Sequence, residues 1–167
     1  MQSPQTEPTP VSPTPSSGGY KVDFYAWTQA QAQLLRQQHW SELDLPHLIE
    51  EIESLGKQQR SELRNRLSVL IAHLLKWHYQ PQRRSRSWIN TLRIQRLDTL
   101  DLLKDNPSLK PYLQTELQNF YQRAIALAAG ETDLPLQTFP PNNPYTLEEI
   151  LDDRFYPGEP APDDLME

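Results

Sequence analysis

The residues best suited to chemistry are a lysine and three arginines within residues 76–86. They are Lys76, Arg83, Arg84 and Arg86. Guanidinium groups bind phosphates and carboxylates through two parallel hydrogen bonds, and the adjacent Trp77 and Trp88 offer faces on which unpaired bases stack. Because no acidic residue lies within this segment, it predicts a contact with an acidic protein or with nucleic acid.

Internal pairing is the competing interpretation of these arginines. Glu50, Glu51 and Glu53 lie on one predicted helix, and arginines that bound them would lock the helices together. Arg84 also precedes Trp88 by four residues, a spacing at which a guanidinium can stack on an indole ring. The sequence leaves internal pairing and an external anion both open.

Arg66 and His73 suggest a different chemistry. An arginine followed by six residues and a histidine is similar to the motif of the higher-eukaryote-and-prokaryote nucleotide-binding ribonucleases. That resemblance implies a histidine that transfers a proton at a scissile phosphate, without a metal ion. On a straight helix the two residues lie about 10.5 Å apart along the axis, and Leu67 stands where those enzymes usually have a polar residue. A histidine hydrogen-bonded at the edge of the core is the structural alternative.

The composition argues against several classes of site. The chain has 167 residues and no cysteine, which excludes disulfides, thiolate nucleophiles and cysteine-ligated metals. Its five glycines form no phosphate-binding loop, and no Glu-x-x-His pair of a di-iron bundle is present. His47 and Glu51 are four residues apart, which fits a pair on a helix surface as well as two ligands. We therefore predict no catalytic residue, no cofactor and no metal site.

Charge is divided between two parts of the chain. The net charge is −6, yet residues 57–96 contain ten basic residues and a single acidic one, Glu62. The remainder is correspondingly acidic. Such segregation indicates either that the two blocks meet inside the fold or that the basic block meets an acidic partner.

No apolar run approaches the roughly 20 residues that a membrane helix needs. The first residues have neither the basic region nor the apolar segment of a signal peptide. We expect a cytoplasmic protein without membrane contact.

Apolar residues recur at helical spacing in most of the chain. We predict helices that begin at Asp23 or Thr28, that span 45–55, 58–79 and 108–130, and that run from just after Pro81 to about 105, with a short helix capped by Thr146. Gly56, followed by a polar run, predicts a break or a kink between the second and third helices. Ile94 and Leu97 lie opposite the main apolar face of the fourth helix, which indicates deep burial or a second chain.

These elements predict an all-α protein: a single compact bundle of about five helices, with a disordered N-terminal tail and an irregular C-terminal segment. The expected divisions are a Pro/Ser/Thr-rich tail at 1–19, a helical domain at 20–157 and a flexible acidic end at 158–167.

Six strings in order resemble one known family. They are D-F-Y-A-W-T (23–28), L-I-E-E-I-E-S-L-G-K (48–57), A-H-L-L-K-W (72–77), Q-P-Q-R-R-S-R-S-W (80–88), P-S-L (107–109) and P-Y-T-L-E-E-I-L-D (144–152). The family is the bacterial, largely cyanobacterial domain of unknown function 29. The resemblance implies an all-helical fold and carries over no activity and no catalytic residues.

Three functions remain after this reasoning. The first is a non-enzymatic helical interaction module that engages a protein partner or a second copy of itself. The second is an accessory protein that contacts RNA or another nucleic acid through residues 76–86. The third is a metal-independent ribonuclease that uses Arg66 and His73. We favour the first.

Overall fold

The computed structural model describes residues 18–161 and 165, and these residues form helices and no strands. The prediction of an all-α protein is confirmed. The α-helices are α1 (Gly18–Val22), α2 (Phe24–Arg36), α3 (Leu45–Tyr79), α4 (Arg86–Asp105), α5 (Leu109–Thr132) and α6 (Leu147–Leu151). Short 3₁₀ turns occupy Trp40–Glu42, Pro81–Arg83 and Leu136–Thr138. No helix in the described part of the chain is long and apolar enough to cross a membrane.

The chain divides into two compact units, Met1–Gly56 and Lys57–Glu167. Most of the predicted tail at 1–19 and part of the acidic end at 158–167 fall outside the described residues, and the predicted domain boundaries stay a prediction.

The first unit is small and is held together by aromatic and polar contacts. Of the two predicted starts of α2, Asp23 is correct, because its carboxylate accepts a hydrogen bond of 2.9 Å from the backbone N–H of Ala26. Trp27 is buried and donates its indole N–H to Asp44 at 3.1 Å. Burial opposes ionisation of Asp44, yet hydrogen bonds from His47 and Trp27 lower the pKa of its carboxyl.

The predicted break at Gly56 is wrong, since α3 runs through it without interruption. A glycine inside a helix costs only about 1 kcal/mol relative to alanine, and the glutamines, lysine and arginine that follow are good helix formers. The polar run is therefore a solvated stretch of helix, and the two predicted helices are one.

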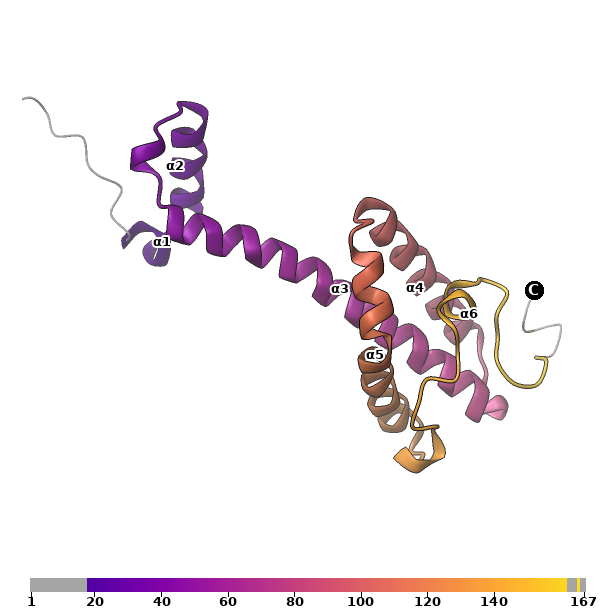
Figure 1. Ribbon diagram of the computed structural model, residues 1–167. Helices are drawn as coiled ribbons and strands as arrows, with labels where there is room; N and C mark the ends of the chain where they lie inside the picture. Colours follow the sequence, from indigo (N-terminus) through magenta and orange to yellow (C-terminus); the bar gives the residue numbers. More distant parts are fainter. Residues whose placement is uncertain (1–17, 162–164, 166–167) are drawn as a thin grey trace, which may run out of the picture. The chain divides into compact units, whose positions relative to one another are not determined.

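The second unit surrounds the C-terminal half of α3. The apolar face predicted there is confirmed, because each of its members is fully buried: Leu63, Leu67, Leu70, Leu74 and Trp77. α4 and α5 pack on this half of the helix, and α6 lies against α4 (Figure 1). α6 begins with the predicted capping box of Thr146 and Glu149.

Two predicted helix boundaries need correction. Pro81 opens a 3₁₀ turn and not α4. α4 starts at Arg86, and its N-cap is Ser85, whose side chain accepts a hydrogen bond from the backbone N–H of Trp88. α5 does not end at Gly130. It continues to Thr132 and ends at Asp133, which adopts the left-handed conformation with φ 57°.

Candidate functional site

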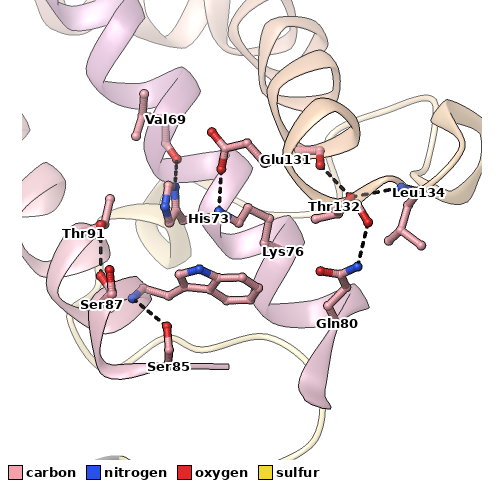
Figure 2. Close-up of polar contacts among 12 residues, drawn as sticks. Val69, His73, Lys76, Gln80, Ser85, Ser87, Thr91, Glu131, Thr132 and Leu134 are labelled. Atoms are coloured by element: carbon pink, nitrogen blue, oxygen red, sulfur yellow. Dashed lines mark hydrogen bonds and ion pairs between the residues drawn. The ribbon is translucent and has the colours of Figure 1, made fainter. Parts of the chain in front are cut away.

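Lys76 lies inside the second unit. It is 5% exposed, its ammonium pairs with the carboxylate of Glu131 on α5, and it lies 4.6 Å from the centroid of the Trp88 ring. Figure 2 shows Lys76 extended toward Glu131, with Gln80 bound to the carbonyl of Thr132 at 2.9 Å nearby. Lys76 of α3 thus contacts α5 through Glu131 and α4 through the ring of Trp88, and it links the three helices.

Arg84 is also engaged within the fold. Its guanidinium donates to the carbonyl oxygens of Trp77 at 3.0 Å and Glu159 at 2.7 Å. The sequence suggested that Arg84 stacks on Trp88, but the guanidinium lies over the ring of Trp77 at 4.8 Å from its centroid. The turn Pro81–Arg83 lies between Trp77 and Arg84 and folds Arg84 back onto the end of α3. Because α4 begins only at Arg86, Arg84 and Trp88 do not have the helical spacing that the sequence suggested. Burial lowers the pKa of Arg84.

Arg83 and Arg86 are exposed. The predicted basic site therefore separates into two internal cations, Lys76 and Arg84, and two surface arginines. The nucleic-acid hypothesis depends on the surface pair, because Lys76 and Arg84 are turned into the fold.

Arg66 and His73 have different neighbours on α3. Arg66 forms ion pairs with Glu62 at 2.7 Å and with Asp98 of α4 at 2.5 Å, and the hydrogen bond that it donates to Glu62 raises its pKa. The Nδ1 of His73 lies 3.0 Å from the carbonyl oxygen of Val69 (Figure 2), so this nitrogen carries the proton and donates it. Burial lowers the pKa of His73, and nearby Lys76 adds to the effect.

Arg96, which no motif singled out, is the most deeply buried charge of the second unit. It is 2% exposed, and its guanidinium donates to the carbonyl oxygens of Ile150, Asp153 and Phe155 at 2.9, 3.4 and 2.7 Å. These three bonds fasten α6 and the segment that follows it to α4. Burial lowers the pKa of Arg96.

The fastened segment, α4 and the start of α5 together form a groove. Two adjoining cavities of about 830 and 460 Å³ share Leu100 and Leu151 as lining residues. We call their combined surface the α4 groove. Its apolar floor consists of side chains from α4 and α6: Leu97, Leu100, Leu103, Leu147 and Leu151. Leu97 is 63% exposed and Leu100 is 45% exposed, so the floor is open to a partner.

The rim of the α4 groove is mainly basic. Four cations line it, namely Arg93, Lys104, Lys110 and Arg154, against the two carboxylates of Asp152 and Asp153. None of the four cationic side chains has an ion-pair partner within residues 18–161. An apolar floor with cations above it can accept a helix that is apolar on one side and acidic on the other.

The first unit carries the opposite kind of surface. Four apolar residues on the first turns of α3 are 53–67% exposed: Leu45, Ile49, Ile52 and Leu55. We call them the α3 stripe. Residues 41–56 around them contain five acidic residues and no lysine or arginine, and Glu50, Glu51 and Glu53 lie on α3 itself, so its first turns form an acidic amphipathic helix.

The sequence contained one signal for the α4 groove. Ile94 and Leu97 predicted a second apolar face on α4, and both are exposed in the structure. The other wall was missed because α6 and Leu151 are far from α4 in the sequence, and the bonds from Arg96 to carbonyl groups that help to hold them there follow no local pattern. Within the described residues, no group of three or more His, Cys, Asp or Glu side chains could hold a metal ion.

Comparison with known proteins supports the resemblance found in the motifs. Searches of the curated proteins and of the solved structures found no significant match. The family profile described as Domain of unknown function DUF29 matches residues 20–156. Since this match covers most of the chain, the protein belongs to the family Domain of unknown function DUF29.

Proposed function

We propose that the protein is a helical interaction module whose α4 groove binds an acidic amphipathic helix of a protein partner. The observation that carries the proposal is the open apolar floor under a basic rim. Leu97 and Leu100 would take the apolar side chains of the partner, while Arg93 and Lys104 would meet its carboxylates.

The second unit supplies a rigid support for such a contact. Leu92 of α4 is buried in the core, Leu103 of the floor belongs to the same core, and Arg96 fixes the opposite wall. Side chains that are held in place before binding lose little conformational freedom when the partner arrives.

Synthetic peptides test the proposal directly. The probe is a labelled peptide with leucine at positions i, i+4, i+7 and i+11 and glutamate on its other face, and its binding is followed by fluorescence anisotropy. The controls are a scrambled peptide and a peptide with lysine in place of glutamate. We expect binding of the acidic amphipathic peptide, weaker binding at high salt, and little or no binding of either control.

Variants locate the binding site. Leu97→Glu places a carboxylate on the floor and should weaken peptide binding at least about tenfold, since a buried leucine contributes about 1.5–3 kcal/mol. Leu136→Glu alters a comparably exposed leucine elsewhere in the second unit and should leave binding unchanged. Equal affinity for the scrambled peptide, or full affinity of Leu97→Glu, would refute the proposal.

A further inference from the structure

We infer that the α4 groove is filled by the α3 stripe of a second copy of this chain, so that the protein associates with itself. This inference rests on the proposed function and names the partner. Three matches between stripe and groove support it, in pattern, in length and in charge.

The pattern is that of a helix bound in a groove. Leu45, Ile49 and Ile52 follow one another at spacings of four and three residues, and Leu55 continues the row. These are the positions at which an amphipathic helix inserts its anchors into an apolar groove. All four side chains are more than half exposed, so each has apolar area to bury.

The lengths agree. From Leu45 to Leu55 the stripe extends about 15 Å along α3 at 1.5 Å per residue. Along α4, the groove extends from Arg93 to Lys104, which is about 16 Å by the same rise. A helix laid along this groove would therefore bring each stripe residue to its floor.

The charges are complementary. The stripe lies in a segment of five acidic residues and no lysine or arginine, and the groove has four cations and two carboxylates on its rim. Two stripes would bring like charges together, as would two grooves, whereas a stripe in a groove brings opposite charges together. If each of two copies gives its stripe to the other, two equivalent contacts form and the assembly closes as a dimer.

Two surface variants and their mixture test this inference in the full chain by sedimentation velocity. Ile52→Lys breaks the stripe and Leu97→Glu breaks the groove, and both residues are exposed enough that folding should be unaffected. We expect a dimer for the unmodified protein and a dissociation constant raised at least about tenfold for each variant alone. The mixture should form a heterodimer of intermediate affinity, because the groove of one variant can bind the intact stripe of the other.

Each other outcome overturns the inference in a recognisable way. If Leu97→Glu alone still dimerises, the groove is not used, and the proposed function loses support as well. If Ile52→Lys alone still dimerises, the α3 stripe is not what fills the groove. The further inference then fails, but the proposed function does not. A mixture that stays monomeric, or an unmodified protein that is monomeric at every concentration, shows that stripe and groove do not meet between copies. In that last case the peptide experiment still decides the proposed function.

Discussion

The two ends of α3 have the same kind of sequence and opposite surroundings. At residues 45–55 the four apolar side chains of the α3 stripe recur at helical spacing and remain more than half exposed. At residues 63–77 they recur at the same spacing and are fully buried, because α4 and α5 cover them. A periodic apolar row therefore predicts a helix with a face to bury, but the neighbouring elements determine what covers it.

This comparison gives the exposed row its meaning. Single exposed apolar residues are ordinary on protein surfaces, whereas a contiguous row of them along one helix is typical of an interaction site. The buried row stabilises the second unit, and the exposed row is available to a partner. Substitutions at matched positions separate these two roles.

The largest expected effect is on the buried row. Leu70→Ala should lower the free energy of unfolding by about 3 kcal/mol, because it leaves a cavity among fully buried side chains. Ile52→Ala, on the exposed row of the same helix, should change it by less than about 0.5 kcal/mol in dilute protein. Urea unfolding followed by circular dichroism measures both. Similar losses for the two variants would remove the contrast between the ends of α3.

The same contrast should hold for charged residues on α4. Arg96→Met removes three hydrogen bonds to carbonyl oxygens and should lower the free energy of unfolding by about 2 kcal/mol. It should also release the wall of the groove and weaken peptide binding. Arg93→Met, three residues earlier and exposed, should leave stability within about 0.5 kcal/mol. A stable Arg96→Met protein with intact peptide binding would contradict the role assigned to Arg96.

Gly56 lies where the exposed and buried parts of α3 join. A Cβ atom at this position would meet no atom within 4 Å, so Gly56→Ala should stabilise the helix by about 1 kcal/mol. The increase should appear as a higher urea midpoint. Gly130→Ala, at a helical glycine of α5 that is equally free of neighbours, is the matched control and should give a similar increase. A decrease in stability at Gly56 would indicate that α3 needs flexibility there.

The smallest effect is a pH dependence confined to the buried part of α3. Burial lowers the folded-state pKa of His73 below 6.5, with Lys76 adding to the shift and Glu131 opposing it. The unfolded chain therefore binds more protons below pH 6.5, and stability should decrease as the pH falls through that value. His73→Gln should make this decrease shallower, while His78, whose pKa burial also lowers, still contributes. An unchanged slope of unfolding free energy against pH would contradict the assignment.

Much of the fold could be predicted because local patterns determine it. The apolar rows gave the helices, and the side chains of Asp23 and Thr146 marked two helix starts that the structure contains. Gly56 misled because a single glycine is weaker evidence than the helix-forming residues that follow it. Gly130 misled because α5 continues for two more residues, to Thr132, and is capped by Asp133 instead.

The candidate site could be predicted only in part. The second apolar face of α4 was visible in Ile94 and Leu97, because it depends on spacing within one helix. The partners of Lys76 and Arg84 were not visible, since Glu131 and Glu159 are distant in the sequence. The α4 groove required the contact of Arg96 with carbonyl groups in and after α6, a contact between side chain and backbone that leaves no pattern in residue types.

Hydroxyl-radical footprinting over a series of protein concentrations tests the binding of stripe to groove most directly, because it reports the exposure of individual side chains. We expect the oxidation rates of Leu97 and Leu100 to fall together with those of Ile49 and Ile52 as concentration rises. The rates of Val22 and Trp40, which are exposed elsewhere, should stay constant. Rates that do not depend on concentration, or protection of only one of the two surfaces, would contradict it.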